Sequence, residues 1–128
     1  GNTVACRHQP WNGLNVLVVD LDQLQAGDDV VLHFSMTNLN ETDPVEGTVV
    51  DLEGNVSDPN QGAQIPLLWD YIRPAGNRAR MSLAWSVFRD GIQIGRSAVR
   101  IYNYNMVVGA GNCIPGGSTA AQRVGRLD

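Results

Sequence analysis

Lysine is absent from this sequence, and all nine basic residues are arginine. Thirteen acidic residues outnumber them and give a formal net charge of −4. Proteins that bind nucleic acid need a basic surface to neutralise phosphates, so this charge balance argues against nucleic-acid binding. The arginines near the middle of the chain, Arg73, Arg78 and Arg80, are expected to lie on a solvated face or to pair with acidic residues.

Long apolar runs are also missing. No run approaches the roughly 18 residues that span a membrane, so we expect no membrane insertion. We find no internal repeat and no amphipathic helical segment, which removes helical bundles and solenoids as fold classes.

Residues that carry chemistry are scarce. The sequence has two histidines, His8 and His33, and it lacks a nucleophile motif, a phosphate-binding glycine loop and a CxxC motif. A Ser–His–Asp site would need a histidine beside a nucleophile, whereas we expect His33 to be a half-buried strand residue. We therefore predict no enzyme activity, no catalytic residue, no metal and no cofactor.

Cysteine occurs only twice, as Cys6 and Cys113 near the two ends of the chain. Such a pair predicts a disulfide that joins the terminal segments, which would stabilise the fold by roughly 4 to 5 kcal/mol in the chain-entropy model. The alternative is two separate buried thiols, and pairing within one chain is left open. A disulfide implies an oxidising compartment, so we expect a secreted or cell-surface protein. Because the chain begins with Gly1 rather than Met, we expect a processed, excised or engineered piece.

Alternation of apolar and polar residues is the dominant pattern. It predicts two strands with apolar residues on one face: Val30, Leu32, Phe34 and Met36 in the first, and Ala79, Met81, Leu83, Trp85 and Val87 in the second. Asp90-Gly91 predicts a tight type I′ turn. The segment 92–104 is then expected to return as one partner strand, with Ile92 and Ile94 in the same register as Tyr102 and Tyr104.

Weaker signals complete the expected fold. Further strands are predicted at 14–20, 45–50 and 63–68, and a single helical turn is predicted near Trp69. The segment 51–55 is expected to form a hairpin-like turn with a positive φ at Gly54 or Asn55. About seven strands predict an all-β, immunoglobulin-like antiparallel sandwich. We divide the chain into an N-terminal lead (1–13), the sandwich (14–108) and a Gly-rich tail or docking arm (109–128).

Binding residues are harder to predict. Trp69 and Tyr71 either plug one end of the sandwich or form an exposed anchor for a ligand. Two oxygen-rich segments have ligand types that suit calcium, although plain turns explain both better. These two segments comprise Asp20, Asp22, Asp28 and Asp29, and Asp51, Glu53, Asn55 and Asp58.

The order of turns and strands resembles the tandem immunoglobulin-like repeats of large bacterial surface and secreted adhesin-like proteins. Four stretches carry the resemblance: 24–30, 51–59, 65–76 and 81–91. It implies stiff β modules that space or display other parts of a protein, and it carries over no catalytic residue. The two cysteines, the lead and the tail depart from these repeats and suggest a terminal or self-associating module.

We therefore expect a non-enzymatic structural or display module of a bacterial surface or secreted protein, and self-assembly through its ends is left open. The alternative is a lectin-like or receptor-binding tip, with calcium assisting. A protein partner or self-association is expected, and a glycan ligand remains open.

Overall fold

The computed structural model describes residues 2–18 and 24–115, and in these ranges about half of the residues lie in strands and few in helical turns. The all-β, sandwich-like fold predicted from the sequence is confirmed. Short helical turns occur at η1 (Cys6–His8), η2 (Pro10–Asn12), α1 (Trp69–Ile72) and η3 (Arg73–Ala75). The strands are β1 (Thr3–Val4), β2 (Leu14–Val18), β3 (Asp29–Thr37), β4 (Val50–Asn55), β5 (Ala63–Leu67), β6 (Arg78–Arg89), β7 (Ile92–Arg96), β8 (Arg100–Asn105), β9 (Val107–Val108) and β10 (Gly111–Asn112).

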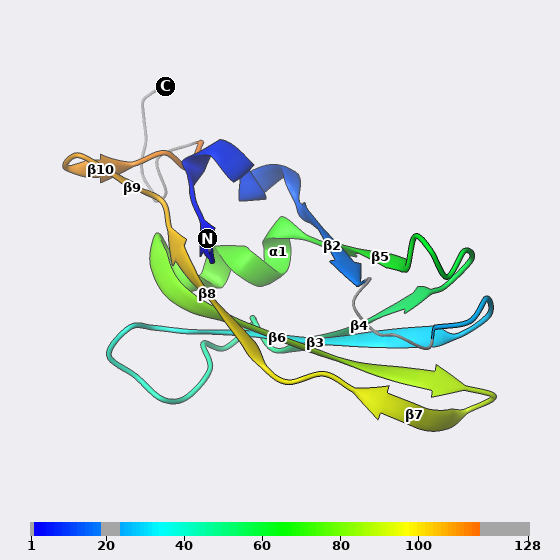
Figure 1. Cartoon of the computed structure of the whole chain (residues 1–128). Coiled ribbons are helices and arrows are strands. Elements are labelled where there is room, and N and C mark those ends of the chain that lie inside the picture. Colours follow the sequence, from blue (N-terminus) through cyan, green and yellow to red (C-terminus); the bar gives the residue numbers. More distant parts are fainter. Residues whose placement is uncertain (1, 19–23, 116–128) are drawn as a thin grey trace.

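Two sheets of unequal size form the layers (Figure 1). The large sheet has the order β1-β8-β6-β3-β4, and β7 also pairs with β6. The small sheet consists of β2 and β5. All pairs are antiparallel except β1 with β8, which is parallel. Ten strands occur in the described ranges instead of about seven, because β1, β9 and β10 contribute two residues each.

The core lies between the sheets, and the two alternating segments supply its centre. In β3, Val30, Leu32, Phe34 and Met36 are all buried, as predicted. The inward residues of β6 are also buried, and Leu32 pairs with Trp85 across the two strands. Burial of one face explains why the register is well determined, since a slip by one residue would turn every apolar side chain outward.

The hairpin between β6 and β7 has the predicted type I′ turn, with positive φ at Asp90 (53°) and Gly91 (79°). The return segment does not form one strand as predicted. It divides into β7 and β8, and Ser97 lies at the break, where its Oγ accepts a hydrogen bond from the Trp85 backbone N–H at 2.8 Å.

The register predicted to unite Ile92 and Ile94 with Tyr102 and Tyr104 is not found, because Ile92 and Ile94 are 68% and 45% exposed whereas Tyr104 is 1% exposed. The small sheet of β2 and β5 lies over the part of the large sheet away from the β6–β7 turn, and it does not reach β7 (Figure 1). A register shift between Val87 and Phe88 adds a bulge to this hairpin. A narrow second layer therefore leaves apolar residues of β7 uncovered.

Two further predictions were wrong around residue 50. Residues 45–49 are not a strand, and the segment 51–55, predicted as a turn, belongs to β4 (Val50–Asn55). Gly54 does not have a positive φ. Instead, a Cβ at Gly54 would lie 2.7 Å from Cγ1 of Ile65, which is buried. Glycine is needed here because β4 and β5 approach closely, and not because the chain turns.

The remaining elements agree with the sequence. Strand β5 and the helical turn α1 form where they were expected, and β2 covers the described part of the segment predicted at 14–20. No helix in the described ranges is long and apolar enough to cross a membrane. The proposed division at residues 13 and 108 stays a prediction, and 116–128 of the predicted tail lies outside the described residues.

Candidate functional site

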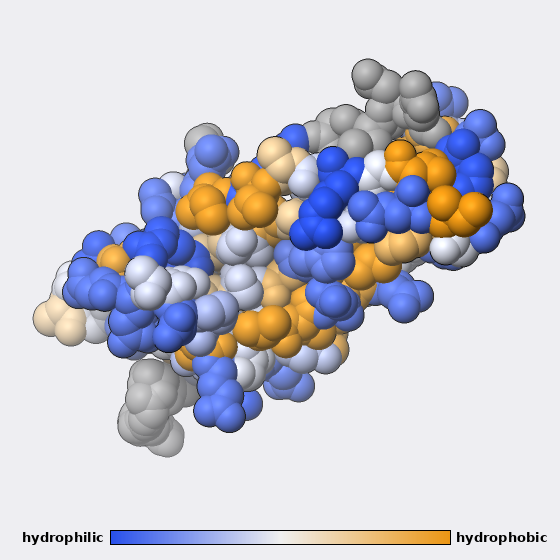
Figure 2. Space-filling view, turned by 90° about the horizontal axis from the view of Figure 1, so that it is seen from below, coloured by the Kyte–Doolittle hydropathy of each residue, from blue (hydrophilic) through white to orange (hydrophobic). Residues whose placement is uncertain are grey.

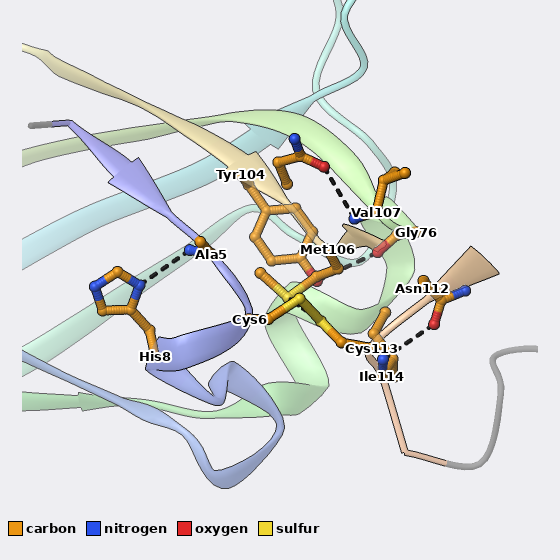
Figure 3. The surroundings of a disulfide bond; sticks show 11 residues. Ala5, Cys6, His8, Gly76, Tyr104, Met106, Val107, Asn112, Cys113 and Ile114 are labelled. Atoms are coloured by element: carbon orange, nitrogen blue, oxygen red, sulfur yellow. Dashed lines mark hydrogen bonds between the residues drawn. A yellow bond between two sulfur atoms is a disulfide. The ribbon is translucent and has the colours of Figure 1, made fainter. Parts of the chain in front are cut away.

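The predicted disulfide between Cys6 and Cys113 is present within the chain (Figure 3). It joins η1 to the residue after β10, and the two Cα atoms are 6.0 Å apart although 107 positions separate them in sequence. Both cysteines are partly buried against the core. The bond therefore closes almost the whole described chain into one loop.

Two buried residues at the end of β8 and just after it, Tyr104 and Met106, belong to the core against which the disulfide packs. Tyr104 is 1% exposed, and its hydroxyl donates a hydrogen bond to the Gly76 carbonyl at 3.3 Å. Burial raises the pKa of the Tyr104 hydroxyl, so the group stays neutral and can serve as a donor at ordinary pH. Met106 is fully buried, and its carbonyl accepts from the Cys113 backbone N–H at 3.0 Å. We call the disulfide with Tyr104 and Met106 the base of the module.

The base and the β6–β7 hairpin occupy opposite ends of the molecule. Figure 1 shows the N-terminus, β9 and β10 in one half and the turn between β6 and β7 at the far end of the other. Because Cys6 is joined to Cys113, the first and last described segments are held at the same end. The chain thus enters and leaves the sandwich near one point.

A second polar arrangement crosses the outer face of the large sheet. His33 Nδ1 lies 2.9 Å from Asp51 Oδ1, and His33 Nε2 lies 2.9 Å from Ser86 Oγ. Asp51 belongs to β4, His33 to β3 and Ser86 to β6, and these three strands are adjacent in the sheet. In the tautomer whose Nδ1–H donates to the Asp51 carboxylate, Nε2 accepts a hydrogen bond from the Ser86 hydroxyl, which is the order of contacts in a Ser–His–Asp triad.

The burial of Ser86 distinguishes this arrangement from a catalytic triad, whose serine must be accessible to substrate. Ser86 is 1% exposed, whereas the side chains of His33 and Asp51 are 30% and 67% exposed. A nucleophilic oxygen must reach a substrate carbonyl, and the Ser86 hydroxyl lies within a continuous sheet. The half-buried strand position predicted for His33 is found, but its contact with Ser86 could not be predicted from the sequence, because it depends on a diagonal between neighbouring strands.

The same face is mixed in character. Figure 2, which views the molecule from the side of the large sheet, shows hydrophobic side chains set among hydrophilic ones. Val99 and Ile101 are 61% and 49% exposed. Scattered exposed apolar residues are ordinary on a solvated sheet, so this face does not by itself indicate a binding site.

An ion pair between buried Asp28 and partly exposed Arg89 joins the residue before β3 to the last residue of β6. Asp28 is 1% exposed, and its Oδ1 and Oδ2 accept from Arg89 Nε at 2.8 Å and Nη2 at 2.9 Å. The Gln25 backbone N–H also donates to Asp28 at 2.8 Å. The hydrogen bonds from Arg89 lower the pKa of the Asp28 carboxyl, against the effect of burial. Both carboxylate oxygens of Asp28 therefore already accept hydrogen bonds from within the chain.

The segments considered for calcium are not assembled in the described ranges. Asp28 is paired with Arg89, and Asp51 contacts His33. No group of three or more His, Cys, Asp or Glu residues that could hold a metal ion occurs in 2–18 and 24–115. Asp20 and Asp22 lie outside the described residues.

The helical turn α1 carries the two aromatics considered for binding. Trp69 and Tyr71 are both half-buried and pack against the core. Asp70, between them, is exposed. This placement agrees with a plug at the sandwich edge, and a binding role for the pair stays a prediction.

A pocket of about 250 Å³ opens between the small sheet and the β1–β8–β6 part of the large sheet. Its described lining is apolar except for a few groups, and it comprises Val4, Leu14, Asn15, Val16, Leu17, Leu67, Met81, Leu83, Trp85, Arg100 and Tyr102. Sequence reasoning correctly placed Trp85 in the core but missed the pocket. A pocket here depends on a second sheet of only two strands, which no local pattern reveals.

Comparisons with protein-family models, curated proteins and solved structures found no match. The resemblance to bacterial immunoglobulin-like repeats therefore stays a prediction.

Proposed function

We propose that this chain is a non-enzymatic structural or display module of a bacterial surface or secreted protein. One observation carries the proposal: the Cys6–Cys113 bond closes the base of a β-sandwich, where the first and last described segments meet. Structural disulfides persist in oxidising compartments, which supports a location outside the cytosol.

The position of the bond gives the module a mechanical property. Tension applied through the flanking chain first loads β1, which lies before Cys6 and pairs with β8, and it then reaches Cys6 and Cys113. Once β1 has separated from β8, the covalent bond carries the load, and the strands between the two cysteines stay off the load path. The β6–β7 hairpin, with its turn at Asp90 and Gly91, would therefore stay folded and exposed at the far end while the base is pulled.

The bacterial assignment rests on the resemblance to immunoglobulin-like repeats. Two of the four stretches that carry it, 24–30 and 81–91, contain the two partners of the Asp28–Arg89 ion pair.

Single-molecule pulling tests the proposal, with handles attached before Gly1 and after Asp128. The 107-residue separation between the cysteines corresponds to roughly 350 to 385 Å of extended chain. We expect this length to stay hidden in the oxidised protein at forces that unfold β-sandwiches. After reduction, the total contour length should increase by about that amount.

The double variant Cys6→Ser/Cys113→Ser is the matched control, and it should show the longer contour with or without reductant. Release of the full length from the oxidised protein would contradict the proposed load path. The comparison uses total contour length, so it remains decisive even if reduction alone unfolds the sandwich.

The alternative of a lectin-like or receptor-binding tip gains no specific support. Trp69 and Tyr71 pack against the core and do not stand free of it. We therefore put forward the structural role alone.

A further inference from the structure

The pocket between the sheets is lined mainly by aliphatic side chains from both layers. Leu67 of the small sheet and Met81 and Leu83 of the large sheet belong to its walls and are almost fully buried, whereas Leu14 and Val16 of β2 are half-buried. Its volume of about 250 Å³ exceeds the roughly 150 Å³ at which an apolar cavity can hold a benzene molecule. The pocket is therefore large enough for a small apolar ligand.

The lining residues follow the strands, so the pocket is a slot between the layers. The alternate residues Met81, Leu83 and Trp85 of β6 line one side, and β2 lines the other side from Leu14 to Leu17. The lined stretch of β6 measures roughly 13 Å, at about 3.3 Å for each residue. An unbranched alkyl chain of medium length fits a slot of this length better than a compact ring does.

Charged groups contribute little to the lining. Arg100 is the one charged residue in the described lining, and its guanidinium carbon lies 4.9 Å from the centre of the Trp85 ring. The guanidinium is thus already in contact with a partner, and the ligand needs no contact with it. A charged group placed against the aliphatic walls would lose its hydration without compensation. The part of the ligand inside the slot is therefore uncharged.

We propose that this pocket binds the alkyl chain of a small single-chain amphiphile. The chain lies between β2 and β6, against Leu14, Val16 and Leu83, and the head group stays at the exposed rim beside Leu17. Burial of apolar surface drives binding, because each methylene removed from water favours the bound state. This inference does not depend on the structural role proposed above.

Methyl ¹H–¹³C NMR of the full chain tests the proposal, with octanol, hexanol and butanol as probes. We expect octanol to shift the methyl signals of Leu14 and Val16 in a saturable manner and to give intermolecular NOEs to them. Each methylene should strengthen binding about fourfold, so hexanol and then butanol should bind more weakly. Ile92 and Ile94, which are exposed but lie outside the pocket lining, are internal controls and should show neither effect.

A variant that fills the slot adds a second test. Val16→Phe places a larger side chain in the slot and should weaken octanol binding at least about tenfold, comparable to the loss of two buried methylenes. Val31→Phe is the matched control, because Val31 alternates with the buried residues of β3 and lies outside the pocket lining. It should bind octanol as the native chain does.

The proposal is overturned if octanol, up to its solubility limit, leaves the signals of Leu14 and Val16 unchanged. It is also overturned if Ile92 and Ile94 respond equally, since octanol would then adsorb to any exposed apolar residue. A ligand-free chain that is a dimer by light scattering, with NOEs between copies at Leu14 and Val16, would assign the pocket to a second copy instead. These comparisons use the native chain and stay decisive if a variant does not fold.

Discussion

Replacing Cys6 and Cys113 together by serine should lower the free energy of unfolding by about 4 to 5 kcal/mol. The bond joins positions 107 residues apart, and a closed loop of that length strongly restricts the unfolded chain. Domains of this size typically have about 5 to 15 kcal/mol of stability in total, so the loss is a large fraction of it.

Urea unfolding at equilibrium, followed by tryptophan fluorescence, measures this effect. The native chain in reductant should behave as the double serine variant does, since both lack the bond. A loss below about 1 kcal/mol in both would show that the base is held by its packing, through Tyr104 and Met106, and not by the disulfide.

Removing Arg89 should destabilise the fold more than removing the charge of its partner Asp28. In Arg89→Gln a carboxylate that is 1% exposed keeps its charge and loses its two guanidinium hydrogen bonds. In Asp28→Asn the buried charge is absent. We expect the order of urea midpoints to be native, Asp28→Asn, then Arg89→Gln, because an unpaired buried charge is the most costly state.

The double variant Asp28→Asn/Arg89→Gln should be more stable than Arg89→Gln alone, which a double-mutant cycle measures. Acid adds an independent test. The folded pKa of Asp28 lies below its unfolded value, so its contribution is complete above about pH 4 and is lost as the pH falls through the folded pKa. The stability of Asp28→Asn should therefore fall less steeply below about pH 4 than that of the native chain. Equal slopes would contradict the pairing.

The elements that sequence analysis predicted well are those whose signal is local. The β3 and β6 segments alternate along their length, and one buried face follows directly from that pattern. Asp90-Gly91 determines its own turn because both residues adopt positive φ. The two cysteines indicated a disulfide because no other cysteine could compete.

The errors share a different origin, since each depends on the opposite layer or on a neighbouring strand. Gly54 was interpreted as a turn residue, but its reason is the approach of Ile65 from β5. Ile92 and Ile94 have an apolar pattern, yet both are exposed, and among the described strands the small sheet of β2 and β5 does not pair with or extend to β7. The contact of His33 with Ser86 and Asp51 joins three strands, and tertiary register of this kind cannot be derived from alternation alone.

The state of Cys6 and Cys113 in the cells that make this protein tests the central claim most directly. Free thiols would be blocked at the moment of lysis, and an unreduced digest would be analysed by mass spectrometry. We expect one linked peptide pair that contains both cysteines and no blocked thiol at either position. Blocked thiols at both positions would contradict the claim that a disulfide closes the base of this module.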